Sequence, residues 1–112
     1  MVETLSRARW VGVATVVLGE LRYGFLTSRK TTENEAQLGR FLAHPIVEVL
    51  PVDNEISQIY AEIFTTLRHA GTPVPTNDVW IAAVATRHGA AVLTYDAHFQ
   101  RIARVTAKVL AT

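Results

Sequence analysis

The segment from Asn77 to His88 constrains the fold more than any other, because its helical pattern has almost no polar face. Its apolar side chains fall on every side of a helix: Val79, Ile81, Ala82, Ala83, Val84 and Ala85. A helix that is apolar all round is buried on more than one side. Its small alanines would also let it lie close to a sheet. The segment therefore predicts a layered fold in which this helix is an inner element.

Strand and helix patterns alternate along the rest of the chain. Short runs rich in apolar and β-branched residues predict strands over 10–17, 46–50 and 90–94, and a last short strand at 109–110. Helical patterns cover 2–9, 18–28, 31–43, 55–70, 77–88 and 96–102. This alternation predicts an α/β fold with a parallel sheet covered by helices on both faces. In such sheets, ligands bind beyond the carboxyl ends of the strands.

Local sequence chemistry predicts several helix ends. Asp53 is expected to cap the helix over 55–70, and Gly71 to end it. Thr32, with a glutamate three residues on, resembles a capping box. Thr76 and Asn77 are capping candidates for the alanine-rich helix, which would leave Asp78 unnecessary as a cap.

Length and composition predict one domain over residues 1–112. The chain is 49% apolar, carries a net charge of +1, and contains no cysteine. Thiolate metal sites, disulfides and cysteine nucleophiles are therefore excluded, and a bound metal needs oxygen or imidazole ligands. No apolar run reaches the roughly 18 residues of a membrane span. The first residues do not form a secretory signal, so a cytoplasmic location is expected.

Three acidic residues stand near predicted strand ends or helix starts: Glu20, Asp78 and Asp96. Each has an ordinary explanation when taken alone. Glu20 suits an exposed helical position paired with a base such as Arg22, Asp78 suits the dipole of a helix N-terminus, and Asp96 suits an N-cap. Taken together, they are expected at one rim of a parallel sheet. Clustered carboxylates repel one another unless a cation lies between them.

A hard divalent ion, Mg2+ or Mn2+, would relieve that repulsion through oxygen ligands. Such an ion holds a phosphate oxygen and acidifies a water for attack on phosphorus. No two histidines have the i, i+4 spacing of a helical zinc site, and the chain has no glycine-rich phosphate loop. The acidic residues therefore favour metal-dependent phosphodiester hydrolysis.

Three segments of the chain are similar to those of one nuclease family. Residues 16–24 (VVLGELRYG), 77–85 (NDVWIAAVA) and 89–99, which contains LTYDAHF, resemble the acidic segments of PIN-domain nucleases, and above all of the VapC-type toxins of toxin–antitoxin pairs. The resemblance implies a three-layer α/β/α fold, Mg2+- or Mn2+-dependent endoribonuclease activity on RNA, a homodimer, and a VapB-like antitoxin partner.

By matching position, the resemblance gives the metal-site and catalytic roles to Glu20, Asp78 and Asp96. Thr94 takes the place of the hydroxyl before the last acid, and Asn77 is a supporting candidate beside the site. Arg22 is a candidate for holding RNA phosphates.

The chain departs from the family pattern before Glu20. PIN domains begin with a strand that ends in an aspartate, and no such strand precedes Glu20 here. The expectation is therefore a PIN-like fold whose N-terminal strand and first catalytic aspartate are missing, leaving three of four acidic residues. Two functions stay open: a ribonuclease toxin, and a binding module that keeps antitoxin or dimer contacts without cleavage. A weaker third option is a remnant with no function of its own.

Overall fold

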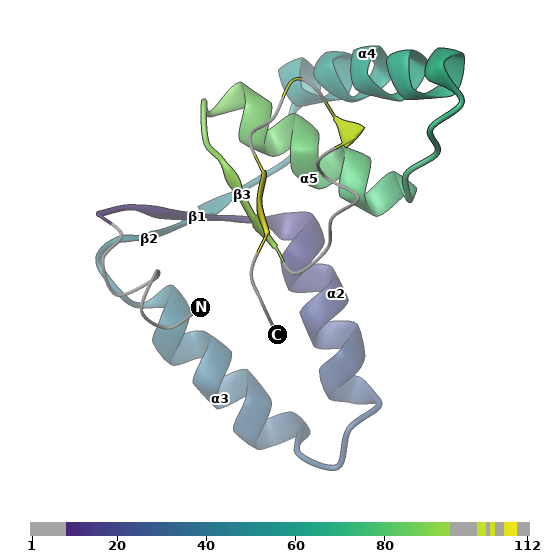
Figure 1. The fold of residues 1–112 in the computed structure, drawn as a ribbon. Helices are drawn as coiled ribbons and strands as arrows, with labels where there is room; N and C mark the ends of the chain where they lie inside the picture. The colour runs from purple at the N-terminus through teal and green to yellow at the C-terminus, as the bar shows by residue number, and fades with distance from the viewer. Residues whose placement is uncertain (1–8, 95–100, 103, 105–106, 110–112) are drawn as a thin grey trace. The chain divides into compact units, whose positions relative to one another are not determined.

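The computed structural model of the chain describes residues 9–94, 101–102, 104 and 107–109, in which strands and helices alternate (Figure 1). The elements in chain order are β1 (Val11–Ala14), α2 (Thr15–Leu26), α3 (Thr31–Leu42), β2 (Val47–Leu50), α4 (Asn54–Ala70), α5 (Thr76–Arg87), β3 (Val92–Thr94) and β4 (Ala107–Val109). Their contacts divide the chain into a first unit, Met1–Pro51, and a second unit, Val52–Thr112. The single-domain organisation stays a prediction.

The first unit is a parallel strand pair joined by two helices. β1 pairs with β2 in parallel, from Val11 opposite Val47 to Ala14 opposite Leu50. The chain between the two strands forms α2 and α3. α2 packs on α3 and on β1, and α3 packs on β2. Val13, Leu18 and Leu38 form the buried cluster that joins the layers. Packed around it are Val11, Val17, Phe25, Leu42 and Val47.

The predicted strand over residues 10–17 is too long, because β1 ends at Ala14 and Thr15 already begins α2. The register gives the reason. Ala14 lies opposite Leu50, the last residue of β2, and Pro51 follows with no N–H to continue the ladder. Val16 and Val17 are therefore helical. A valine inside a helix costs less than about 1 kcal/mol of stability relative to alanine.

The second unit is built on α4 and α5, which pack side by side (Figure 1). Both predicted ends of α4 are confirmed. The side chain of Asp53 accepts a hydrogen bond from the N–H of Ile56, and Gly71 ends the helix in the left-handed conformation with φ 69°. One side of α4 faces the core, with Ile56, Ile63 and Leu67 buried.

The prediction that the alanine-rich helix is buried on several sides is confirmed. In α5 the buried residues fall on every side of the helix, which packs against α4 and β3: Val79, Ala82, Ala83, Val84 and Ala85. The predicted caps are wrong. Pro75 occupies the N-cap of α5 without a side-chain cap, and Thr76 and Asn77 are already helical. The capping box at Thr32 is also wrong, because Lys30 is the N-cap of α3.

β3 and β4 pair in parallel, with Val92 opposite Ala107 and Thr94 opposite Val109. A last strand is present as predicted, but it lies at 107–109 and not at 109–110, whose second residue is outside the described part of the chain. Both strand pairs of the described chain are parallel, as expected. The helix predicted over 2–9 and most of that over 96–102 lie outside the described residues. Within the described part, no helix is both long and apolar enough to cross a membrane.

Candidate functional site

Glu20 lies in the second turn of α2, just after β1, and is exposed. Gly24, one turn further along the helix, has open space around it: a Cβ added there would meet no atom within 4 Å. There is therefore free space on α2 one turn after Glu20. A carboxylate in this setting is accessible to a ligand from solvent.

Arg22 does not pair with Glu20. Its Nε lies 3.0 Å from Oε1 of Glu35 on α3, in an ion pair between two partly exposed side chains. The ordinary explanation of Glu20 as the partner of Arg22 is therefore wrong. The sequence does not predict Glu35 as the partner of Arg22, because the two lie 13 residues apart, beyond the reach of any helical spacing rule.

Glu20 differs from most other carboxylates of the described residues in having no bonded partner there. Five of the others are engaged: Glu35 with Arg22, Glu48 with Trp10, Asp53 with the N–H of Ile56, Glu55 with Arg87, and Glu62 with Arg104. Glu33, an exposed residue of α3, resembles Glu20 in this respect. Glu20 is thus one of the few described carboxylates left available for a cation.

Asp78 is in the first turn of α5 and is half-buried. Its N–H donates to the carbonyl of Pro75 at 3.0 Å, which holds the residue at the helix N-terminus. The positive end of the helix dipole favours an anion at this place. The next residue, Val79, is fully buried, so the backbone that carries Asp78 is fixed in the core. Asn77, beside it, is also half-buried.

The convergence of the three acids stays a prediction. Glu20 belongs to the first unit and Asp78 to the second, while Asp96 lies outside the described residues. Thr94 is the last residue of β3, as expected of a residue at a strand end. Among the described residues, no three His, Cys, Asp or Glu side chains form a group that could hold a metal ion.

Comparison with known proteins identifies relatives of the chain, which the local geometry does not. The family model described as PIN domain matches residues 2–105. The chain is 40% identical over 85 residues to Ribonuclease VapC4 of Mycobacterium tuberculosis. The match covers 76% of this chain and 65% of that protein. It is 30% identical over 101 residues to Ribonuclease VapC2 of Rickettsia felis, covering 89% and 74% of the two chains. The chain thus spans slightly less than two thirds of the length of VapC4.

Solved structures agree with the sequence matches. The crystal structure of VapBC2 from Rickettsia felis, bound to a DNA fragment from their promoter, has a TM-score of 0.84 at 28% identity, covering 96% of this chain and 80% of that chain. VapBC-1 from nontypeable Haemophilus influenzae has a TM-score of 0.83 at 26% identity, covering 96% and 82%. The predicted α/β, PIN-like fold class is confirmed, and the chain belongs to the PIN domain family, in its VapC group.

Proposed function

We propose that the chain is a metal-dependent endoribonuclease toxin of a toxin–antitoxin pair. The observation that carries this proposal is the state of Glu20: exposed, without a bonded partner among the described residues, and beside the open space at Gly24. On a helix surface, a base can pair with a glutamate from three or four residues away, and α2 has no base at those positions around Glu20. Here the nearby Arg22 pairs elsewhere, with Glu35. The family membership and the ribonuclease names of the relatives support the same activity.

The donor chemistry of the proposed site fits a hard divalent cation. Glu20, Asp78 and Asp96 offer carboxylate oxygens, and the chain holds no cysteine that would favour a softer metal. These three residues would hold Mg2+ or Mn2+. When bound, the ion supplies positive charge for a phosphate oxygen and acidifies a water for attack on phosphorus.

Other residues of the chain take supporting roles in this proposal. The hydroxyl of Thr94 and the amide of Asn77 would orient the carboxylates by hydrogen bonds. Arg22 would hold an RNA phosphate. Its guanidinium would then divide its N–H donors between that phosphate and Glu35. Asp78, at the N-terminus of α5, benefits from a helix dipole that stabilises its charge without a bound cation.

The test uses the 112-residue chain with Mn2+ or Mg2+ and a labelled RNA. We expect cleavage that EDTA abolishes. Glu20→Gln, Asp78→Asn and Asp96→Asn should each reduce the rate by more than the about 10- to 100-fold that loss of an outer-shell group costs at a metal site. Glu33→Gln is the matched control, because Glu33 is also an exposed helical glutamate without a bonded partner among the described residues. Equal loss in the control, or full activity in Asp96→Asn, contradicts the assignment.

The second candidate is a binding module that keeps antitoxin or dimer contacts and cleaves nothing. It is favoured by the exposed apolar side chains of α2, such as Tyr23 and Leu26, which a partner protein could cover. Calorimetric titration of Mn2+ separates the two candidates. Binding that disappears in Asp78→Ala supports the enzyme. Absence of binding in the unmodified chain, together with absence of cleavage, supports the module.

The proposal includes protein partners. Apolar side chains of the first unit stand exposed on α2 and α3: Leu21 at 41%, Tyr23 at 73%, Leu26 at 76% and Phe41 at 37%. Exposed apolar side chains that form a contiguous patch mark protein-binding surfaces, and we propose that these residues belong to one. We assign these helices to a homodimer or to a VapB-like antitoxin, in keeping with the VapBC complexes among the structural neighbours. We also propose a cytoplasmic location, because the proposed substrate is RNA.

Light scattering after size-exclusion chromatography tests the homodimer. The unmodified chain should elute with twice the monomer mass, and Leu26→Glu should shift it toward the monomer if α2 lies in the dimer interface. Gln58→Glu, a change of charge at an exposed position of α4, is the control. A monomer mass for the unmodified chain contradicts the homodimer, whereas a dimer that tolerates Leu26→Glu contradicts only the place of the interface.

A further inference from the structure

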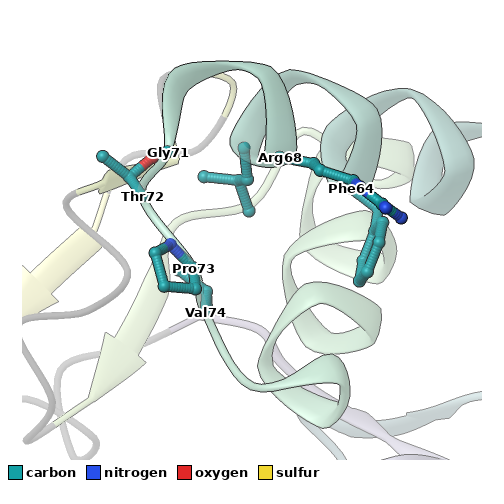
Figure 2. Close-up of a pocket in the computed structure, with 7 residues that line it drawn as sticks. Phe64, Arg68, Gly71, Thr72, Pro73 and Val74 are labelled. Carbon is teal, nitrogen blue, oxygen red and sulfur yellow. The ribbon is translucent and has the colours of Figure 1, made fainter.

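A small cavity in the second unit has none of the proposed site residues in its lining. It has a volume of about 250 Å³ and opens between the last turns of α4 and the connector to α5 (Figure 2). The residues that line it are Phe64, Leu67, Arg68, Gly71, Thr72, Pro73 and Val74. Leu67 and Val74 are buried and form its floor, and Phe64 on α4 is half-buried. The cavity therefore offers an apolar base with an open mouth.

The size of the cavity indicates what it can hold. Sites for cofactors and drug-sized ligands commonly measure about 300 to 1,000 Å³. At about 250 Å³ and open on one side, this cavity is too small to enclose such a molecule. It is large enough for one apolar side chain from another polypeptide.

The wall of the cavity is fixed before anything binds. Gly71 turns the chain at φ 69°, and the N–H of Thr72 donates to the carbonyl of Leu67 at 3.1 Å. Proline rings at 73 and 75 restrict the connector further. The guanidinium of Arg101 donates to the carbonyl of Pro73 at 3.2 Å, which holds the connector in place. A preformed pocket loses little conformational entropy on binding.

The rim of the cavity is positively charged. Arg68 belongs to the lining and is exposed, and Arg101 reaches the connector at Pro73 and is also exposed. Neither makes an ion pair among the described residues, whereas Arg87 and Arg104 of the same unit are paired with Glu55 and Glu62. The pocket thus combines an apolar floor with two arginines that lack a carboxylate partner in the described chain.

We propose that this cavity is a docking site for an extended, acidic segment of a partner protein. One leucine-like side chain of the segment enters the cavity above Leu67 and Val74. A carboxylate on either side of it pairs with Arg68 and Arg101. Arginine suits such an interface because its planar group binds carboxylates through two hydrogen bonds. The proposal does not depend on RNA cleavage, because no residue of the cavity belongs to the proposed nuclease site.

The experiment measures binding of a fluorescein-labelled nine-residue peptide to the full 112-residue chain by fluorescence anisotropy. The peptide carries one central leucine flanked by aspartates and glutamates. We expect saturable binding that weakens at least about tenfold when the leucine is replaced by serine, and again by about tenfold in Arg68→Glu, a change of about 1.4 kcal/mol each. Arg40→Glu is the matched control: Arg40 is an exposed helical arginine of α3, and its replacement should leave binding unchanged.

A charge-reversed peptide, with lysines in place of the acids, completes the test. It should bind Arg68→Glu better than it binds the unmodified chain, because the reversed rim restores complementarity. The proposal is overturned if binding is unchanged by the leucine-to-serine replacement or by Arg68→Glu, or if no binding occurs. A single-stranded RNA that competes for the same site, with loss in Arg68→Glu, overturns it in favour of a nucleic-acid contact. Cleavage of RNA by Arg68→Glu should equal that of the unmodified chain, which separates this site from the nuclease.

Discussion

The Nε atom of Arg22 lies 3.0 Å from Oε1 of Glu35 and so links α2 to α3 across 13 residues of sequence. The two side chains are 48% and 42% exposed, so water screens the pair and its contribution to stability is small. Its consequence is electrostatic. Arg22 is occupied by Glu35, and Glu20, two residues before Arg22 on the same helix, is left without that partner.

Removal of Glu35 should strengthen RNA binding at Arg22. In an inactive Asp96→Asn background, Glu35→Gln is expected to raise the affinity for single-stranded RNA, because it removes a negative charge and frees the guanidinium. Arg22→Gln should lower the affinity and reduce the slope of log K against log salt concentration by about 1. Anisotropy titrations at three salt concentrations measure both. An unchanged affinity and slope in Arg22→Gln would rule out a phosphate contact at this residue.

The same substitution tests how little the ion pair stabilises the fold. We expect the free energy of unfolding in urea to fall by less than about 1 kcal/mol in Glu35→Gln, as for other exposed pairs. A larger loss would show that the pair holds the α2–α3 hairpin together.

Asp53 should matter more for stability than any of these surface charges. Its carboxylate accepts from the N–H of Ile56 at 2.9 Å at the start of α4, and Ile56 is fully buried. Asp53→Ala is expected to cost about 1 kcal/mol of unfolding free energy, within the roughly 0.5 to 2 kcal/mol measured for lost N-caps. Asp53→Asn keeps a side-chain oxygen and should keep most of that stability. Equal losses in the two variants would show that charge, and not the cap, is the cause.

Gly71 and Gly39 should respond to alanine in opposite directions. Gly71 is held at φ 69°, where a Cβ meets the following carbonyl, so Gly71→Ala should destabilise the chain by about 1 to 2 kcal/mol. Gly39 lies inside α3 with no atom within 4 Å of an added Cβ, and Gly39→Ala should stabilise it by about 0.5 to 1 kcal/mol. Chemical denaturation measures both. Stabilisation by Gly71→Ala would contradict the left-handed helix end.

The stacked rings of Tyr60 and Trp80 should couple α4 to α5. Their centroids lie 3.8 Å apart at an interplanar angle of 14°. A double-mutant cycle with Tyr60→Leu and Trp80→Leu is expected to give an interaction energy of about 0.5 to 1.5 kcal/mol beyond the loss of buried area. The same cycle with Phe64→Leu and Trp80→Leu is a useful reference, because Phe64 stacks on Tyr60 and no ring contact joins it to Trp80 in the described structure. A coupling near zero for Tyr60 and Trp80 would show that the rings only fill space.

Where local chemistry decides the structure, the sequence was sufficient. Asp53 and Gly71 bound α4 as predicted because a carboxylate cap and a left-handed glycine act within one turn of the chain. The burial of α5 on every side followed from its composition, since no side of that helix could face water without exposing apolar area. The α/β class and parallel pairing followed from the order of the elements.

Prediction failed where a distant segment competes with local preference. The valines at 16 and 17 favour a strand, yet the ladder stops at Ala14 because its partner strand ends before Pro51. Thr32, Thr76 and Asn77 have the chemistry of caps, and each lies one or two residues after the observed N-cap, which is Lys30 or Pro75. Helix ends shift in this way because packing of the whole element outweighs a single capping bond of about 1 kcal/mol.

For the candidate site, spacing and residue type predict Glu20, Asp78 and Asp96, the family resemblance adds the supporting residues, and their convergence stays a prediction. Only the tertiary structure decided that Arg22 pairs with Glu35 and leaves Glu20 open, that Tyr60 stacks on Trp80, and that the connector after Gly71 encloses an apolar cavity. These contacts join residues on different elements. Which of these residues meet depends on how the helices pack, and no local sequence pattern specifies a contact between residues far apart in the chain.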